Sequence, residues 1–560
     1  MTRWTCFLAI LSLTGAACTD ESATTSTVEP STTTRPTVET TTTTAPPGCP
    51  DVFCVRYHIH PDAAWADRTP VTAGDFAFTY ETIVDPDLSI YSREGYDRIS
   101  GYQVEDDKTI LFAFSEVYAP WQTLFRPVLP RHILEGEAFN TVWDEAITMG
   151  SGPFVFSEWT PDERIVLTRN PNYWQDAGGD VQSVDIVHVE SRDALVEALD
   201  SQEIDMFYVE PDAELVEEVE GMGDVEWEAG LGATWEHFEF NFDDVRLQDL
   251  FVRQAIAQGI DREAIVEAVV RPIAPEAEPL GNTIWLNASA NYEDHFNDRF
   301  PYDPAAAETL LVDNGCVRGE DGIYECGGRR LSFSWATTAG MPSRNQQFEM
   351  VQADLAEIGI EVTPNFGPNS QVFSQQFFYG GADQWQLFNF AFIGSHDPAG
   401  GNTLYYCEGD APNGFGFLNN LGYCNEQVDA MIRQTESQID PAERAATYNE
   451  ADELWLSNIP LVPLYQKPTF FAWNPVIMGP QDNTTEIGPF WNIADWTGKE
   501  NVAFGAADQV VTMNVLEPDG DRFVVGLVTS AILQGAYTIT PDFEYEPQLV
   551  TSAETIIQAD

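Results

Sequence analysis

Residues 65–83 of the chain read WADRTPVTAGDFAFTYETI, and this stretch marks the start of a helix. Thr72 and Asp75 have the spacing of a capping box, in which each side chain accepts a hydrogen bond from a backbone amide of the first turn. Phe76, Tyr80 and Ile83 then fall on one helical face. The spacing predicts a helix that begins after Thr72 and turns this face toward a core.

Helix and strand signals continue on both sides of this stretch. A half-buried strand ending at Pro61 is predicted by the alternation of Val55, Tyr57 and Ile59 with Arg56, His58 and His60. Further boundaries are a helix opened by Asp303 and Pro304 and closed by Gly315, a helix opened by Asp440 and Pro441, and a stripe of Val351, Leu355 and Ile358 closed by Gly359 before a strand from Ile360. Helices and strands therefore mix throughout, which predicts α/β or α+β domains and no fixed-period repeat.

Composition points to a large acidic protein. The 560 residues are 43% apolar and 12% aromatic, which is enough for two or three domains with substantial cores. Acidic residues outnumber basic ones by 90 to 26, so the net charge is 26 − 90 = −64. This excess excludes a general affinity for nucleic acid or anionic lipid. It is spread along the whole chain, which favours a role in solubility over a dedicated acidic partner-binding segment.

The amino terminus resembles a bacterial lipoprotein signal. Arg3 precedes an apolar run that ends in small residues and Cys18, so residues 1–18 are interpreted as the signal and Cys18 as the lipid-anchored residue. Gly15 stands where the lipoprotein pattern prefers Leu, which leaves ordinary cleavage open. Residues 19–50 are nearly all Thr, Ser, Pro, Glu and Ala and predict a disordered tether. With no later run apolar enough to span a bilayer, we expect membrane attachment by the lipid anchor only.

Six further cysteines predict three disulfides in an exported protein. Neighbours in sequence suggest the pairs Cys49 with Cys54, Cys316 with Cys326, and Cys407 with Cys424. Metal ligation is the alternative, but the chain contains no CxxC pair and no nearby His that completes a zinc set. We therefore expect no metal and no cofactor.

A series of motifs resembles family 5 extracellular solute-binding proteins, the group of oligopeptide, dipeptide, nickel and cello-oligosaccharide binders. The Trp65 stretch is similar to the family signature WxDGxPxTAxD, with Arg68 in place of Gly, a position where a residue other than Gly would be strained if the turn needs a positive φ. The other matches follow in family order: LPRHIL (129–134), GSGPFVF (150–156), LTRNPNYW (167–174), IDMFY (204–208), FEFNF (238–242), VRQAIAQGIDRE (252–263) and PLVPLY (460–465).

The resemblance implies an α/β fold of the type II periplasmic-binding-protein kind (cluster C), with two hinged lobes and an extra small domain. The expected parts are a small domain of residues 51–149 with 545–560, lobe I of residues 150–265 with 466–544, and lobe II of residues 266–465. The function implied is that of the substrate-binding component of an ABC importer, a monomer outside the cell membrane that captures an oligopeptide-like solute for a membrane permease. It implies no enzyme activity.

One departure from the family order predicts a circular permutation. The strand that opens the family fold is missing before Trp65, whereas residues 508–549 resemble it. We therefore predict that residues 508–516 form a strand in the sheet of lobe I. The segment from Leu549 to Ile557 should pair antiparallel with Phe53 to Ile59. An unrelated appendage or a mis-assembled gene is the alternative.

The solute site is predicted in lobe II. Residues 383–401 resemble the segment that lines the cavity of peptide binders, where an Asp four residues before a Pro pairs with the peptide's amino terminus. Gly394 occupies that position and Asp397 is the nearest substitute. Arg344 is a candidate for binding a carboxylate bidentately, although a surface salt bridge is a competing interpretation. The aromatic residues Trp385, Phe390 and Phe392 are candidate contacts, with a place in the core as the alternative.

Other functions remain open on sequence grounds. Abundant aromatic residues leave an oligosaccharide ligand as an alternative, and His58 and His60, on the same face of a strand, leave nickel. A secreted hydrolase finds little support because the chain has no GxSxG, HExxH or phosphate-loop motif. An adhesive surface protein is suggested only by the Thr-rich stalk.

Overall fold

The Thr72 capping box begins helix α1 (Ala73–Ile83), as predicted, and a carboxylate oxygen of Asp75 accepts a hydrogen bond from the Thr72 amide at 2.8 Å. The structure, a computed structural model, describes residues 48–407, 418–507, 510, 512–516 and 523–557. Arg68, in the turn before the helix, has a φ of 75°. The turn therefore does place a residue other than Gly in the left-handed region.

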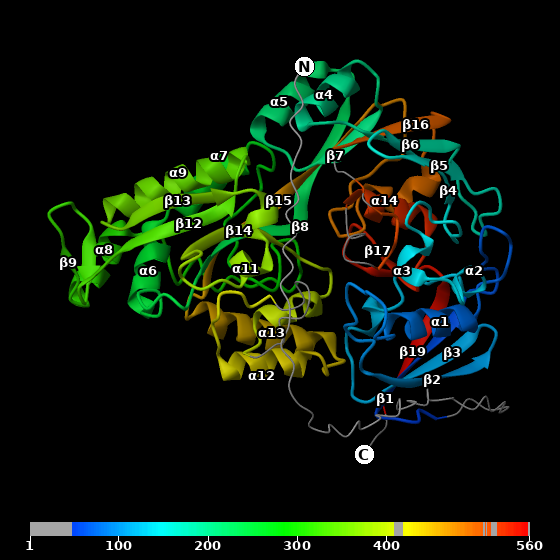
Figure 1. The fold of residues 1–560 in the computed structure, drawn as a ribbon, viewed down its shortest axis with the longest axis horizontal. Helices are drawn as coiled ribbons and strands as arrows, with labels where there is room; N and C mark the ends of the chain where they lie inside the picture. Colours follow the sequence, from blue (N-terminus) through cyan, green and yellow to red (C-terminus); the bar gives the residue numbers. More distant parts are fainter. Residues whose placement is uncertain (1–47, 408–417, 508–509, 511, 517–522, 558–560) are drawn as a thin grey trace, which may run out of the picture. The chain divides into compact units, whose positions relative to one another are not determined.

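The first sheet joins the two ends of the described chain. Its four strands lie in the order β19 (Val550–Ile557), β1 (Phe53–Ile59), β3 (Thr109–Phe114) and β2 (Ile99–Asp106). β1 pairs antiparallel with β19, with Phe53 opposite Ile557, and Figure 1 shows β19 in red among the blue strands. The predicted pairing of the carboxyl-terminal segment with Phe53 to Ile59 is confirmed.

The second sheet has ten strands and passes through both lobes. Its order is β13 (Glu361–Gly367), β12 (Ser332–Thr338), β14 (Leu387–Ile393), β8 (Glu226–Phe240), β15 (Leu461–Trp473), β7 (Met206–Val209), β16 (Asn501–Ala506), β6 (Ser183–His188), β5 (Arg164–Arg169) and β4 (Phe154–Thr160). The long antiparallel strands β8 and β15 occupy its middle. The predicted boundary between the lobes, at residues 465 and 466, falls inside β15.

The prediction of a strand at residues 508–516 is wrong for the residues that the structure describes. The carboxyl-terminal strand of the large sheet is β16, which pairs parallel with β6 and β7. Residues 510 and 512–516 form no strand, and 508, 509 and 511 lie outside the described residues. The side chain of Asn514 explains the difference, because it accepts from the Trp143 amide at 2.9 Å and donates to the Asn140 carbonyl at 2.7 Å. These bonds tie the segment to helix α3 and its C-cap residue instead of to a strand. The permutation itself stays a prediction.

Helices cover the sheets in three groups. Those near the small sheet are α1, α2 (Arg131–Leu134), α3 (Phe139–Val142) and the 3-10 helix η1 (Trp121–Thr123). Lobe I contains α4 (Arg192–Asp200), α5 (Ala213–Met222), α14 (Phe523–Ile532) and η3 (Pro489–Asp495). Lobe II contains α6 (Leu250–Gly259), α7 (Arg262–Val269), α8 (Pro304–Asp313), α9 (Pro342–Glu357), α10 (Asn369–Val372), α11 (Gln375–Phe378), η2 (Pro398–Leu404), α12 (Glu426–Thr435) and α13 (Pro441–Leu456).

Two small sheets complete the fold. They are β9 (Val317–Arg318), β10 (Tyr324–Cys326) and β11 (Arg329–Arg330), and the hairpin of β17 (Tyr537–Ile539) and β18 (Tyr545–Pro547). All three predicted disulfides are present: Cys49–Cys54, Cys316–Cys326 and Cys407–Cys424. No helix in the described part of the chain is long and apolar enough to cross a membrane.

The small domain and lobe I share one hydrophobic core, whereas lobe II has its own. Phe53 of the small sheet, Phe154 of lobe I and Val528 of α14 belong to a single buried cluster. The Gly152 amide also donates to the Ile532 carbonyl at 2.7 Å, so the GSGPF motif holds the end of α14. A shared close-packed core resists relative movement. We therefore expect the small domain and lobe I to move as one body against lobe II.

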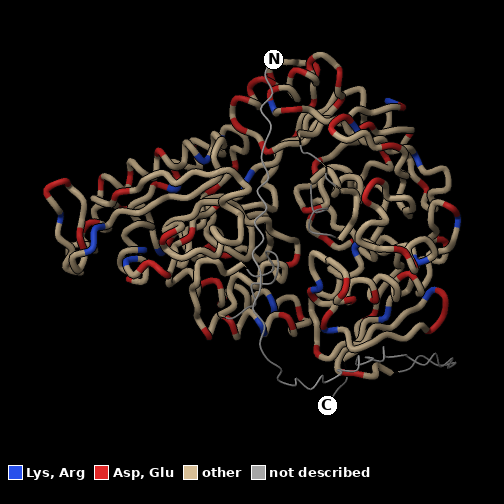
Figure 2. The backbone as a smooth tube through the Cα atoms, viewed as in Figure 1, with Lys and Arg blue, Asp and Glu red and all other residues tan. Residues whose placement is uncertain are grey.

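Charge is distributed over the whole described chain. Figure 2 shows acidic residues along both lobes and the small domain, with few basic residues between them. The described residues all belong to one compact unit, Thr40–Asp560, and the other unit, Met1–Glu39, lies outside the described residues.

A chain that ends at residue 500 should not fold. It would lose β16 from inside the large sheet, α14 from the shared core and β19 from the edge of the small sheet. We expect calorimetry to show no cooperative thermal transition for it. A chain that begins at residue 48 serves as the control and should melt like the full chain. Cooperative melting of the shortened chain near the full-length midpoint would contradict this prediction.

Candidate functional site

A cavity of about 490 Å³ lies where the small domain, the carboxyl-terminal segment and lobe II meet. The small domain contributes Glu94 and Tyr118, the segment after β15 contributes Glu486 and Tyr537, and lobe II contributes Asp397. Cavities of this size are typical of sites for small solutes. Because its walls come from both sides of the β8 and β15 crossing, movement of lobe II would open or close it.

Contacts across the cavity rim hold the two sides together. Arg98 of the small domain forms an ion pair with Glu436 of lobe II, and the Ala119 amide donates to the Glu436 carbonyl at 2.7 Å. The rings of His396 in lobe II and Tyr545 in the carboxyl-terminal hairpin lie 4.6 Å apart. These few contacts join the small domain and the carboxyl-terminal hairpin to lobe II beside the cavity.

A tight turn places Glu94 in the cavity wall. Gly95 has a φ of 75°, and a Cβ at this position would lie 2.6 Å from the ring of Tyr118. Only Gly fits such a turn against an aromatic ring without strain. The next residue, Tyr96, is buried and accepts a hydrogen bond from the Phe125 amide. The Tyr118 ring and the Tyr96 hydrogen bond thus fix the two residues that follow Glu94.

Most charged groups around the cavity are paired. Asp397 accepts hydrogen bonds from the guanidinium of Arg444 at 2.8 and 2.7 Å, and Arg126 forms an ion pair with Glu486 at 2.9 Å. Burial alone would lower the pKa of Arg444, but Asp397 raises it above its ordinary value. The carboxylate of Asp397 is therefore already paired with Arg444 and is not free to pair with a charged group of a solute.

Glu94 differs from these residues. Its carboxylate lines the cavity and has no hydrogen-bond or ion-pair partner among the described residues. Burial, followed by the nearby carboxylate of Glu436, raises its pKa to about 7, and Arg98 offsets only part of this. Water in the cavity still reaches the side chain, which is exposed. Glu94 is an uncompensated acid in the cavity wall.

Comparison with known proteins identifies the family. Residues 50–412, more than half of the chain, match bacterial extracellular solute-binding proteins, family 5 Middle. The chain belongs to this family.

Relatives of this solute-binding protein include named peptide binders. The oligopeptide-binding protein OppA of Mycobacterium tuberculosis is 29% identical over 425 residues, which cover 74% of this chain and 69% of the relative. The dipeptide-binding protein DppE of Bacillus subtilis is 23% identical and covers 73% and 75%. These names are those of the relatives, and both matches cover more than two thirds of either chain.

Solved structures share the fold. The periplasmic EDTA-binding protein EppA superposes with a TM-score of 0.72 at 22% identity, covering 80% of this chain and 85% of that one. The oligopeptide-binding protein AppA of Bacillus subtilis, in complex with a nonapeptide, gives a TM-score of 0.64 at 20% identity and covers 81% and 89%. The predicted two-lobed type II fold is confirmed.

Arg344 of this solute-binding protein lies away from the cavity. It is buried in α9, and its guanidinium binds Glu236 of β8 through Nε at 2.7 Å and Nη2 at 3.2 Å. Lys467 of β15 lies 3.5 Å from the same carboxylate. The expected solute carboxylate is replaced by one of the protein's own. Arg344 therefore fastens α9 to the central strands, and it is not a surface salt bridge either.

The aromatic candidates divide between core and surface. Trp385 and Phe390 are buried in the core of lobe II, where the Trp385 indole donates to the Phe377 carbonyl at 3.0 Å. They do not line the cavity, because they pack inside lobe II, where Phe390 contacts Phe378 of α11. Phe392, farther along the strand, lines a hollow of about 60 Å³ with Trp235. Of the five predicted ligand contacts, Asp397 alone lines the cavity of about 490 Å³.

Gly394 explains the missing family carboxylate. Its amide donates to the Ala233 carbonyl at 2.9 Å, and a Cβ at residue 394 would lie 2.5 Å from that oxygen. An Asp side chain does not fit there unless β8 moves. The close approach of the β8 backbone therefore accounts for Gly in place of the family's Asp.

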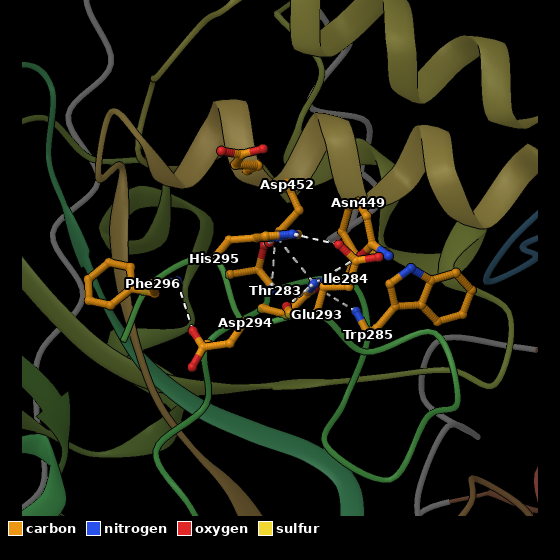
Figure 3. Close-up of polar contacts among 12 residues, drawn as sticks. Thr283, Ile284, Trp285, Glu293, Asp294, His295, Phe296, Asn449 and Asp452 are labelled. Carbon is orange, nitrogen blue, oxygen red and sulfur yellow. Dashed lines mark hydrogen bonds and ion pairs between the residues drawn. The ribbon is translucent and has the colours of Figure 1, made fainter. Parts of the chain in front are cut away.

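A polar cluster in lobe II is structural (Figure 3). Asp452 of α13 is fully buried and accepts hydrogen bonds from the Thr283 amide at 3.0 Å and from the Thr283 hydroxyl. His295 Nδ1 lies 2.7 Å from the other carboxylate oxygen. Burial would lower the pKa of His295, but Asp452 raises it. In a hydrolytic triad the hydroxyl bonds to the imidazole, whereas here it bonds to the carboxylate. The cluster attaches the segment that contains Thr283 and His295 to α13.

Metal ligands do not gather in the described ranges. Within them, no group of three or more His, Cys, Asp or Glu side chains could hold a metal ion. His58 lies 3.8 Å from Glu554, and the ring of His60 lies 4.8 Å from that of Trp174. The two histidines suggested for nickel thus have separate neighbours.

Sequence reasoning missed most of the cavity wall. Glu94, Tyr118 and Tyr537 come from three loops or strands far apart in the chain. A weak signal existed at Glu94, since the Gly that follows it suggests a turn between the predicted helix and the next strand. One carboxylate among 90 acidic residues nevertheless carries no information by itself.

Replacing Arg344 with Ala should destabilise the fold. Burial raises the pKa of Glu236, but Arg344 and Lys467 together hold it below the ordinary value, so the pair contributes stability above about pH 4.5 that is lost as pH falls further. Removing Arg344 leaves the buried carboxylate underpaired and should lower the free energy of unfolding at pH 7 by about 3 kcal/mol. Chemical denaturation measures this.

The double variant Arg344→Met with Glu236→Gln is the matched control. It removes both charges and should be less destabilised than Arg344→Ala. A loss below about 1 kcal/mol in Arg344→Ala, typical of exposed pairs, would contradict the buried role.

Proposed function

We propose that this chain is the substrate-binding component of an ABC importer that captures an oligopeptide-like solute and delivers it to a membrane permease. The observation that carries the proposal is the cavity of about 490 Å³, whose walls come from the joined small domain and lobe I on one side and from lobe II on the other. A solute there touches both sides only when they are closed. Membership of family 5 supports the same role.

Closure would follow from the central strands. β8 and β15 are the continuous connection through the large sheet, and β15 is irregular next to Pro463 and Pro468. Pro has no amide hydrogen for the ladder, so pairing is interrupted where the lobes meet. A solute that binds the closed form better than the open one shifts the population toward it. The closed form is then the one that the permease recognises.

An oligosaccharide is the second candidate solute. The cavity wall contains the aromatic residues Tyr91, Tyr96, Tyr118, Trp491 and Tyr537, and flat apolar faces with polar ends suit sugar rings as well as peptides. Nickel is the weaker alternative, because the named histidines have separate neighbours. We propose that the protein acts by binding alone and catalyses no reaction.

We further propose that the protein is a monomer held outside the cell membrane by lipid on Cys18, with residues 19–50 as its tether. Cys18 and residues 19–47 precede the described residues, so the proposal depends on the composition of the amino terminus. The predicted end of the tether at residue 50 is corrected, because Cys49 is buried and forms a disulfide with Cys54. The small-residue run before Cys18 and the Thr-rich stretch after it support this reading.

Short peptides should stabilise the protein. A ligand that binds only the native state at a hundred times its Kd adds about 2.7 kcal/mol to the free energy of unfolding. We expect peptides of three to five residues to raise the thermal midpoint in differential scanning fluorimetry. Cello-oligosaccharides and nickel chloride are the comparison ligands. A shift with an oligosaccharide and none with any peptide would replace the peptide assignment by the sugar alternative.

Cys18 should carry the lipid. Two or more acyl chains give stable membrane attachment, whereas one chain is marginal. Mass spectrometry of the mature protein should therefore find an acylated Cys18 at the amino terminus. Cys18→Ala should release the protein from membranes, and Cys6→Ala should leave it attached. An unmodified amino terminus at another residue would disprove the anchor.

A further inference from the structure

We infer that Glu94 is a subsite for a cationic group, so that the transported solute carries an amine or guanidinium. The inference deepens the proposed function, on which it rests, by naming the charge of the solute. The family pattern pairs an Asp of lobe II with the amino terminus of a peptide, but Gly394 stands at that position and Asp397 already binds Arg444. The geometry points to Glu94, on the opposite wall, instead.

The charge balance of the cavity wall supports a cation. The wall contains three carboxylates, those of Glu94, Asp397 and Glu486, and one guanidinium, that of Arg126. Arg126 is paired with Glu486, and Arg444 behind the wall with Asp397. Among the described residues around the cavity, this leaves Glu94 as the carboxylate without a partner.

Arg98 does not neutralise Glu94. It forms ion pairs with Glu116 at 3.0 Å and with Glu436, and its guanidinium carbon lies 5.4 Å from the ring centre of Tyr118. Two carboxylates therefore share this one cation. The nearby side chains of Asp97, Glu436 and Asp397 add negative potential at Glu94. An anionic solute would meet repulsion here, whereas a cation would supply the missing counter-charge.

The surroundings of Glu94 suit an organic cation. Tyr91, Tyr96 and Tyr118 lie on the same wall, and aromatic faces attract ammonium and guanidinium groups. The clamped Gly95 turn holds the carboxylate in place before binding, which reduces the entropy lost on association. The cavity and its aromatic wall separate Glu94 from the many acidic residues of the outer surface.

The high acidic content of the chain is the competing explanation. It accounts for carboxylates on the open surface, such as Glu137, which is exposed and lies outside the cavity lining. It does not account for a carboxylate that a tight turn holds in a cavity wall, close to other carboxylates and without a counter-ion of its own, because like charges held close together repel each other. Such a cost is commonly retained at binding sites.

Matched pairs of probes test the inference by isothermal titration calorimetry. One pair is a tetra-alanine peptide with lysine or with norleucine at the second position, each with free and with acetylated amino terminus. The other pair is chitosan tetramer, which carries free amines, and its N-acetylated form. We expect at least one cationic member to bind more than tenfold more tightly than its neutral partner.

Glu94→Gln should remove this preference. The cationic probe should lose more than tenfold in affinity, while the neutral partner changes less than threefold. Glu94→Asp, which keeps the charge, should lie between, and Glu137→Gln should match the natural protein. Circular dichroism establishes that the variants are folded.

A pH series provides an independent readout. Because the pKa of Glu94 is raised to about 7, the carboxylate gains a proton as pH falls from 8 to 6.5, and affinity for the lysine probe should fall with it. The amino-acetylated lysine peptide is used here, because its lysine side chain stays charged throughout this range, whereas a free amino terminus would titrate within it. In Glu94→Gln the profile should be flat, which separates Glu94 from the nearby His396.

The outcomes are distinct. If neutral probes bind as tightly as cationic ones, if Glu94→Gln leaves the preference intact, or if no cationic probe binds, the inference is overturned. Binding of the neutral and the lysine peptides with equal affinity would leave the proposed peptide function standing. Binding of chitosan tetramer alone would support the Glu94 subsite and reject the peptide solute.

Discussion

The pairing of β8 with β15 is the constraint on which the rest of the structure depends. These strands pair from Leu461 opposite Glu239 to Trp473 opposite Glu226, and every other strand of the large sheet is added on one side of them or the other. Where the pairing is interrupted, the Gln466 side chain donates to the carbonyls of Leu231 and Gly232. A side chain thus satisfies backbone groups that the ladder leaves open.

Buried charge reinforces the same crossing. Glu210 after β7, Lys467 of β15, Glu236 of β8 and Arg344 of α9 form a chain of ion pairs, with separations of 2.6, 3.5 and 2.7 Å. Pairs of this kind stabilise little relative to apolar residues, but they penalise any arrangement that separates them. They therefore specify how α9 and the central strands fit together, whereas the cavity rim is held by fewer contacts.

The cavity shows how the two sides divide the work. The small domain and lobe I share one core, so they present Glu94, Tyr118 and Tyr537 as one wall. Lobe II presents Asp397, which Arg444 neutralises. The unpaired carboxylate of Glu94 and the paired carboxylate of Asp397 thus lie on different walls of the cavity.

The sequence by itself determined the local elements, the disulfides and the family. The Thr72 capping box, the Asp303 and Asp440 helix starts and the strand before Pro61 are encoded by residues that are close in sequence, and the structure contains all of them. The three cystine pairs join near neighbours. The pairing of β19 with β1 was also foreseeable, because each segment needed a partner.

Only the tertiary structure decided the site. Arg344 and Trp385 looked like contacts for a solute, but burial against Glu236 and the Phe377 carbonyl assigns them to the framework. The strand expected at 508–516 gave way to β16 because side-chain bonds from Asn514 compete with a ladder. Glu94 could be identified only from the structure, because it is distinguished by the lack of a counter-ion. Whether a charge is paired depends on side chains that are distant in the chain and adjacent in space.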